Sequence, residues 1–206
     1  MNVFRIPAGI YAVNCYIVFS EDSKSGIVVD PGGSADEIVK FVEDNNIDLK
    51  YIVLTHGHGD HIGGVKALKD KYDIPVLIHK EDEEMLKDAN KNLSKTMAFG
   101  AIEIIPDRTL SNGDIIKFGE LEATILHTPG HTKGGICLKI ENYLISGDTL
   151  FKGSIGRTDL YGGDYETLIS AIKTKLLVLD DEIVVLPGHG QSSTIKNERI
   201  SNPFLN

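Results

Sequence analysis

The stretch Thr55-His56-Gly57-His58-Gly59-Asp60-His61 places three imidazoles and one carboxylate within six residues. It follows the apolar run 51–54, which predicts a buried strand. Neutral imidazole and carboxylate are the usual nitrogen and oxygen ligands of zinc, iron and manganese in proteins. An alternating His-x-His in a turn can point two rings at one ion. The stretch therefore predicts a metal site at the end of a strand.

Three further candidate ligands occur later in the chain: His131, Asp148 and His189. Each follows an apolar run of strand length, at 123–126, 143–145 and 183–186, and each sits in a turn rich in glycine or proline. Open α/β folds bind their ligands at strand ends on one rim of a sheet, so we expect these residues to converge with the first stretch. Five histidines and two aspartates are too many for one tetrahedral ion and suit two ions that share a carboxylate.

Composition favours one domain, residues 1–206, with a small-molecule ligand. The chain has 206 residues, 41% of them apolar, and a net charge of -9 with no cluster of Lys or Arg. This charge disfavours nucleic acid or an anionic membrane as a partner. The N-terminus has no signal-peptide core, and no apolar run approaches the roughly 20 residues that span a bilayer, so we expect a cytoplasmic protein.

Hydrophobic periodicity predicts a mixed α/β (α+β) chain. The predicted strands are Val13–Phe19, 26–30, 51–54, 74–78, Ile115–Phe118, 121–126, 135–140, 143–145 and 183–186. The predicted helices are 34–45, with a capping box at Ser34, one with an apolar face of Val65, Leu68 and Tyr72, an acidic one at 81–89, and one that Asp164 caps. Residues 91–100 have no clear period, and a lid or substrate loop could lie there.

Four other residues could take part in chemistry, and their surroundings favour a structural role. Cys15 and Cys137 lie far apart in apolar, strand-like segments, which is typical of buried reduced thiols. His79 ends a strand before Lys80, where a hydrogen-bonding or helix-capping role is expected. His127 is separated from His131 by a proline, so the two cannot form a helical pair.

The ordered series of seven candidate ligands resembles the metallo-β-lactamase superfamily over essentially all 206 residues. Within that superfamily, 55–64, 150–159 and the closing Asn-Pro-Phe at 202–204 look like the single-domain hydrolases that are similar to glyoxalase II. The resemblance implies a four-layer αβ/βα sandwich with two pseudo-twofold halves. It also implies that the site lies along one edge of the sandwich.

The same resemblance implies how the ligands divide between two divalent ions, zinc first, with iron or manganese as alternatives. His56, His58 and His131 would hold the first ion, Asp60, His61 and His189 the second, and Asp148 would bridge them. Asp60 and Asp148 would be the catalytic carboxylates. A metal-bridged hydroxide would then attack a thioester or ester such as S-acylglutathione, without a serine or cysteine nucleophile.

The loop after Asp148 supplies candidate substrate contacts. Arg157 and Asp159 could form an ion pair that fixes the metal-bearing loop or could meet an anionic substrate; an ordinary surface turn is the alternative. Lys152 and Tyr161 are candidates of the same kind. The C-terminal domain that binds glutathione in full-length glyoxalase II has no counterpart here, so we expect carrier contacts from 91–100 and 152–161.

Two other functions stay open. A mononuclear iron persulfide dioxygenase, a neighbouring branch with a facial triad of two histidines and the aspartate, tolerates the same Gly-Arg-Thr-Asp loop. A non-catalytic metal-binding scaffold is the third hypothesis, although every ligand position is intact. A secreted β-lactamase would want a signal peptide, and nuclease branches carry basic surfaces that this chain lacks.

Overall fold

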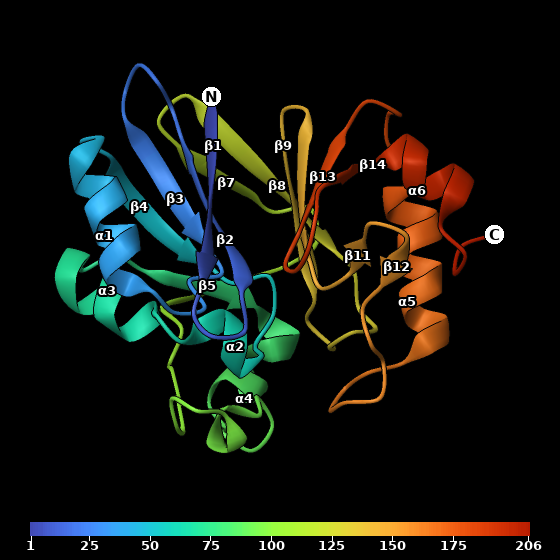
Figure 1. Ribbon diagram of the computed structural model, residues 1–206, viewed down its shortest axis with the longest axis horizontal. Coiled ribbons are helices and arrows are strands. Elements are labelled where there is room, and N and C mark those ends of the chain that lie inside the picture. Colours follow the sequence, from blue (N-terminus) through green and yellow to red (C-terminus); the bar gives the residue numbers. More distant parts are fainter.

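The computed structural model describes residues 1–206 and consists of two six-stranded sheets packed face to face with helices on their outer sides (Figure 1). The first sheet has the order β1-β2-β3-β4-β5-β6, and the second has the order β14-β13-β10-β9-β8-β7. The helices α1 and α3 cover the first sheet, and α5 and α6 cover the second. The expected four-layer αβ/βα sandwich is therefore confirmed.

The first sheet comprises β1 (Asn2–Ala8), β2 (Val13–Phe19), β3 (Ser25–Val29), β4 (Asp48–Val53), β5 (Val76–His79) and β6 (Arg108–Leu110). The second comprises β7 (Ile115–Phe118), β8 (Leu121–His127), β9 (Ile136–Ile140), β10 (Tyr143–Gly147), β13 (Val184–Pro187) and β14 (Ser193–Thr194). The strands β11 (Leu150–Phe151) and β12 (Ser154–Ile155) form a separate small hairpin. The helices are α1 (Ala35–Asp44), α2 (Gly59–Ile62), α3 (Val65–Tyr72), α4 (Glu83–Leu86), α5 (Tyr165–Ala171) and α6 (Ile195–Ser201), with short helical turns η1 (Lys80–Asp82), η2 (Ser94–Thr96) and η3 (Ile172–Leu176).

The strand β2 shows why the sandwich has apolar cores on both sides of a sheet. All seven of its residues are buried. Cys15 and Ile17 pack towards α1 and α3, whereas Tyr16 and Val18 pack towards the second sheet, as the period of two in a strand requires. A strand buried on both faces is therefore a continuous apolar run, which is how it stands out in the sequence.

A third core lies between the second sheet and its helices, and it includes Cys137, Leu144 and Leu168. Cys137 and Cys15 are both free and buried, as predicted. The side chain of Asp164 accepts a hydrogen bond from the Thr167 amide, so the predicted cap of α5 is present.

The predicted capping box at Ser34 is wrong, although the helix begins next to it. Ser34 has a left-handed backbone (φ 49°) and makes no side-chain cap. Its hydroxyl instead accepts a hydrogen bond from the Gly9 amide at 3.1 Å. The Ser34 hydroxyl thus stabilises the turn between β1 and β2, whereas the capping-box pattern predicted that it would cap α1.

The candidate ligands follow strands whose ends meet at one edge of the sandwich. The Thr55–His61 stretch follows β4 and includes α2, His131 follows β8, Asp148 follows β10 and His189 follows β13. In Figure 1 the helix α2 lies low in the middle of the molecule, between the layers. No helix is both long and apolar enough to cross a bilayer.

Candidate metal centre

Three imidazoles converge to form the first of two candidate ligand groups. A third possible group, Asp30 with His56 and His61, overlaps both. The Nε2 atom of His131 lies 3.0 Å from Nδ1 of His58 and 3.3 Å from Nε2 of His56. All three rings are buried. A tetrahedral zinc ion with metal–nitrogen bonds of about 2.0–2.1 Å separates its ligand nitrogens by about 3.3–3.4 Å. The 3.3 Å pair has this spacing and the 3.0 Å pair is slightly closer, so the three nitrogens lie near enough to share one ion.

Hydrogen bonds at Nδ1 of His131 and His56 leave the Nε2 lone pairs of these two rings free for a metal ion. Nδ1 of His131 lies 2.8 Å from the Arg157 carbonyl oxygen, which can only accept, so Nδ1 carries the proton. The Thr55 hydroxyl donates to Asp30 at 2.6 Å and must therefore accept from Nδ1 of His56, at 3.1 Å. An imidazole that carries a single proton, on Nδ1, leaves Nε2 free to bind metal, as a ligand requires.

A second group contains Asp60, His61 and His189. Nε2 of His189 lies 3.3 Å from the Asp60 carboxylate. Nδ1 of His61 lies 2.9 Å from Asp30, while its buried Nε2 makes no hydrogen bond. An unpaired buried nitrogen costs free energy unless something fills its place, and a divalent cation fits this one.

The carboxylate of Asp148 lies between the two groups. Its oxygens are 3.4 Å from His61, 3.7 Å from His189 and 3.8 Å from His131. The buried Oδ1 makes no hydrogen bond. The two groups with one shared carboxylate are suited to two metal ions.

Burial and neighbouring charge keep His56, His58 and Asp148 in the protonation states that ligands need. Burial, followed by the neighbouring imidazoles, holds the pKa of His56 well below its usual range and lowers that of His58 to about 3. Burial alone would raise the pKa of Asp148, but His61 and the other histidines outweigh it and lower that pKa. Neutral imidazoles and ionised carboxylates are the forms that bind metal.

The electrostatics of His61 differ from those of the other rings. Burial opposes its positive charge, but Asp148 and Asp30 outweigh burial and raise the pKa of His61 well above its usual value. Asp30 accepts from Nδ1, whereas Asp148 lies 3.4 Å from Nε2 without a hydrogen bond, so both carboxylates act on the charge of this ring. A divalent cation at Nε2 supplies the positive charge that this pair of carboxylates attracts.

Asp30 is a functional residue that the sequence interpretation missed. It is buried and accepts hydrogen bonds from the Thr55 amide at 2.7 Å, the Thr55 hydroxyl and His61. It orients His61 directly and His56 through Thr55. The only signal was its position in a strand-end turn, Asp-Pro-Gly-Gly, on the expected rim.

Asp82 is a second missed residue, and it joins two ligand-bearing loops. Its carboxylate accepts from the Gly57 amide at 3.1 Å, the Thr132 hydroxyl at 2.7 Å and the Gly134 amide at 2.6 Å. The first loop carries His56 and the second carries His131. Nothing in the acidic segment 81–89 distinguishes Asp82 from its exposed neighbours.

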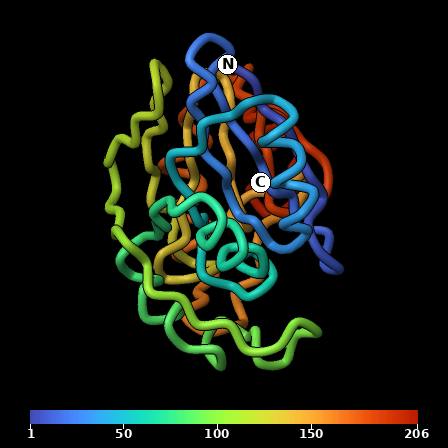
Figure 2. Tube along the Cα trace, turned by 90° about the vertical axis from the view of Figure 1, so that its left-hand side faces the viewer, coloured from blue at the N-terminus to red at the C-terminus, as the bar shows by residue number.

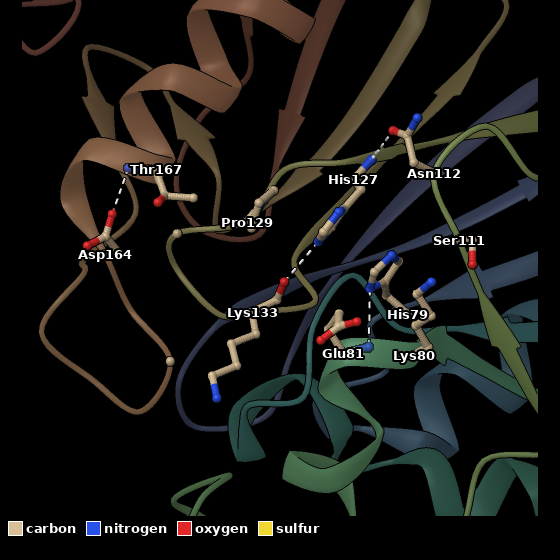
Figure 3. A pocket seen from close by; sticks show the side chains of 12 residues that line it. His79, Lys80, Glu81, Ser111, Asn112, His127, Pro129, Lys133, Asp164 and Thr167 are labelled. Atoms are coloured by element: carbon tan, nitrogen blue, oxygen red, sulfur yellow. Dashed lines mark hydrogen bonds between the residues drawn. The ribbon is translucent and has the colours of Figure 1, made fainter.

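The two remaining histidines lie outside both ligand groups, as predicted. Their rings stack at a centroid distance of 3.9 Å, and Nδ1 of His79 accepts from the Glu81 amide at 3.3 Å, which caps η1. They line a polar cavity of about 630 Å³ shown in Figure 3, which none of the seven candidate ligands lines. Nε2 of His127 lies 2.8 Å from the Lys133 carbonyl oxygen.

The predicted Arg157–Asp159 ion pair is present and exposed, with nitrogen–oxygen distances of 2.7 and 2.8 Å. The part of Arg157 that meets the centre is its backbone carbonyl. Lys152 points instead to Gln191, at 3.0 Å, in the loop after His189. The Tyr161 hydroxyl donates to Glu84 at 3.2 Å, and the substrate-binding roles of these side chains stay predictions.

Comparison with known proteins agrees with this geometry. Residues 8–189 match the family model described as "Metallo-beta-lactamase superfamily". Hydroxyacylglutathione hydrolase GloC of Haemophilus influenzae is 39% identical over 100% of this chain and 99% of its own. The B3 metallo-beta-lactamase BLEG-1 has a TM-score of 0.94 and 36% identity, covering 99% of both chains, and TTHA1623 in a di-iron-bound form has a TM-score of 0.88 and 33% identity, covering 98% of this chain and 100% of that one. The chain therefore belongs to the metallo-beta-lactamase superfamily and is a metallo-hydrolase with a centre suited to two metal ions.

Proposed function

We propose that this protein hydrolyses acyl thioesters, such as S-acylglutathione, at a two-metal centre. His56, His58 and His131 would hold one ion, and Asp60, His61 and His189 the other. The observation that carries the proposal is the place of Asp148, within 3.4–3.8 Å of histidines from both groups and with one buried oxygen unpaired.

The metal ions and the two catalytic carboxylates would have separate roles in thioester hydrolysis. Two bound divalent ions supply a water whose pKa is lowered towards neutrality, together with Lewis acidity for the carbonyl oxygen. Asp60 and Asp148 accept hydrogen bonds from the attacking water and so aim its lone pair at the carbonyl carbon. The thiol that leaves has a pKa near 8.5, so its departure needs little help from an acid.

The cysteines support water as the nucleophile. Burial, with some contribution from Asp30, raises the pKa of Cys15 well above its usual value, and burial raises that of Cys137 to about 11. Neither thiol ionises near neutral pH, and a thiol that stays protonated is a poor nucleophile.

Contacts to an anionic thiol carrier would come from the polar side of the site. The ring of Tyr161 lies 5.2 Å from the Lys91 ammonium and 5.3 Å from the Lys133 ammonium. Arg157 stands in the same loop, four residues before Tyr161. Lys91 pairs with Glu84 and Arg157 with Asp159, so Lys133 is the cation of this group without an ion-pair partner and the first to meet a carboxylate of glutathione or a smaller carrier.

The direct test is Asp148→Ala. We expect wild-type protein to bind two divalent ions per chain and to hydrolyse S-lactoylglutathione without oxygen. The variant should lose the activity and most of the second ion while its circular dichroism is unchanged. Two retained ions with near-normal turnover in the variant would refute the assignment.

The same preparation separates the competing functions. A mononuclear iron persulfide dioxygenase would hold one iron and consume oxygen with glutathione persulfide, while a scaffold would bind metal and turn over neither substrate. Metal analysis after purification without added metal distinguishes zinc from iron and manganese. The complete second group of ligands favours the hydrolase.

A β-lactam is the second substrate class to assay, because BLEG-1, a B3 metallo-beta-lactamase, matches this chain along its whole length. Hydrolysis of a chromogenic cephalosporin with a kcat/KM above that for S-lactoylglutathione would replace the thioester proposal. We expect kcat/KM for S-lactoylglutathione to be the higher of the two.

A further inference from the structure

Two turns far apart in the sequence present exposed apolar side chains side by side. Ile10 and Tyr11, between β1 and β2, are 72% and 39% exposed, and Phe99 is 39% exposed. The rings of Tyr11 and Phe99 meet edge to face with centroids 5.9 Å apart, and the Tyr11 hydroxyl accepts from the Ala98 amide at 3.4 Å. Figure 2 shows the two turns together at the lower right, one blue and one yellow-green. We call Ile10, Tyr11 and Phe99 the apolar rim.

Close backbone contacts place the apolar rim beside the metal centre. A Cβ atom on Gly9 would lie 3.1 Å from the Gly32 carbonyl oxygen, and one on Gly32 only 2.0 Å from that of Asp60. The turn that holds Ile10 and Tyr11 is therefore separated from Asp60 by a single layer of backbone.

The second turn reaches the same side of the centre. Met97, two residues before Phe99, packs so tightly on Gly59 that a Cβ atom there would lie 2.7 Å from its sulfur. Gly59 separates the candidate ligands His58 and Asp60. Both turns therefore border the ligand-bearing α2.

The centre is open towards solvent on this side. Among the candidate ligands, the side chains of His189 and Asp60 are 33% and 17% exposed, and that of Asp148 is 13% exposed. The other four are buried. The amide of Asn14, the second residue of β2 after the β1–β2 turn, donates to the Gly188 carbonyl at 2.7 Å, immediately before His189. The apolar rim thus flanks the entrance over His189 and Asp60.

The border of the site has two chemically different sides. On one side the Arg157 carbonyl meets His131, and its loop runs on to Tyr161 with a lysine on either side. The apolar rim lies on the side of Asp60. A thioester likewise has two ends, a charged or polar thiol carrier and an acyl group. An exposed apolar surface loses unfavourable contact with water when an apolar group covers it, so the acyl group is the end that suits the rim.

We propose that the apolar rim binds the acyl group of the substrate and selects thioesters of apolar acyl chains several carbons long. This inference rests on the proposed thioester hydrolysis. It places residues 97–99 at the acyl end of the substrate, whereas the sequence led us to expect that segment to contact the thiol carrier.

The kinetic test compares acetyl and hexanoyl thioesters of glutathione. Each methylene that the rim buries should multiply kcat/KM by about two to four. The four extra methylenes of the hexanoyl ester should therefore raise kcat/KM about twentyfold or more in the wild type. The double variant Tyr11→Ala/Phe99→Ala should reduce this ratio below about fivefold. Ile200→Ala, an equally simple loss of an exposed side chain (68%) on α6, should leave the ratio unchanged.

Affinity gives a readout that does not depend on turnover. Calorimetry on the metal-loaded protein should find S-hexylglutathione at least about twentyfold tighter than S-methylglutathione, and the double variant should lose that difference. If the wild type hydrolyses neither ester but keeps the affinity ratio, the proposed function fails and the apolar rim stands. If wild-type protein binds the two S-alkylglutathiones equally well and has equal kcat/KM for the two esters, the apolar rim does not bind the acyl group.

A second copy of this chain is the competing occupant of the apolar rim. Sedimentation velocity at the assay concentration should give the same molecular mass for wild type and double variant. A wild-type dimer that the double variant dissociates, with the chain-length ratio unchanged, also overturns the assignment.

Discussion

At the scale of single residues, Asp30 illustrates how a side chain outside the seven candidate ligands can decide whether metal binds. It accepts from His61 and from Thr55, which in turn fixes His56. We expect Asp30→Asn to weaken the affinity for the second ion by about tenfold to a hundredfold, because an amide presents a donor where His61 needs an acceptor. Competition with a metallochromic chelator measures this affinity.

The matched control for that experiment is Asp36→Asn, which makes the same change at an exposed site in the first turn of α1. It should leave both metal affinities unaltered. Normal affinity in Asp30→Asn would show that His61 keeps its orientation by packing alone.

Arg157 gives a prediction that separates its backbone from its side chain. The carbonyl oxygen holds His131, and the guanidinium pairs with Asp159 in solvent. We therefore expect Arg157→Ala to raise KM for glutathione thioesters severalfold while kcat stays within about threefold. The same kinetics on an uncharged N-acetylcysteamine ester serve as control, and a large fall in kcat on both esters would contradict the division.

His79 links stability to pH through its burial. Burial, followed by the charge of His127, lowers the pKa of His79 to about 4, whereas the unfolded chain titrates near 6.5. The unfolded state therefore binds more protons between these values, so stability is complete above about pH 6.5 and falls as the pH drops towards 4. We expect His79→Asn, which keeps an acceptor for the Glu81 amide, to reduce the loss of unfolding free energy between pH 7 and pH 5 by about 1–2 kcal/mol in urea denaturation. Parallel curves for the two proteins would exclude His79 as a source of the pH dependence.

At the scale of elements, the turn η1 acts as a brace between two loops through Asp82. Asp82→Ala would leave the amides of Gly57 and Gly134 without their buried acceptor. We expect it to cost about 2–4 kcal/mol of unfolding free energy and to lower metal occupancy in both groups. Glu81→Ala, one residue earlier and exposed, is the control and should change stability by under about 0.5 kcal/mol. A similarly small change for Asp82→Ala would show that water replaces the carboxylate.

Elements that bury a long apolar run were predictable, and short edge elements were not. The bounds of β2 and β7 match their patterns because each fills a whole strand with apolar or alternating residues. The strands β1 and β6 were missed: the first is an edge strand with exposed positions and Pro7, and the second has only three residues. Pairing with a neighbour, which no local pattern records, makes these segments strands.

At the scale of the whole molecule, each ligand group takes residues from both sheets. His56, His58, Asp60 and His61 follow the first sheet, whereas His131, Asp148 and His189 follow the second. Metal bound there would therefore link the two halves as well as occupy a site. We expect removal of tightly bound metal to lower Tm by about 8–16 °C, since free metal at a thousandfold excess over Kd contributes about 4 kcal/mol.

Differential scanning calorimetry with and without excess chelator measures that shift. The Asp148→Ala variant is the comparison, because it should show a smaller shift from its weakened second group. A Tm that does not respond to the chelator in wild type would mean that the halves dock without help from metal.

The convergence of the seven candidate ligands was predictable from the sequence, and the residues that support them were not. Seven residues of metal-binding type at successive strand ends formed a pattern that one sequence can reveal, and the structure brings all seven together. Asp30 and Asp82 belong to no spacing rule, because their value lies in the hydrogen bonds they accept from residues 25 or more positions away. Only the folded chain shows which of the 30 acidic residues are buried in this way.

The division of ligands between the sheets also has a kinetic meaning. While the chain folds, neither half alone can offer a full set of donors, so tight metal binding must wait until the two sheets have docked. An interaction that forms after the rate-limiting step leaves the folding rate unchanged and slows unfolding instead. The ions would then act on the lifetime of the native state, and a metal-loaded molecule would stay folded far longer than an apo molecule that reached the same structure at the same speed.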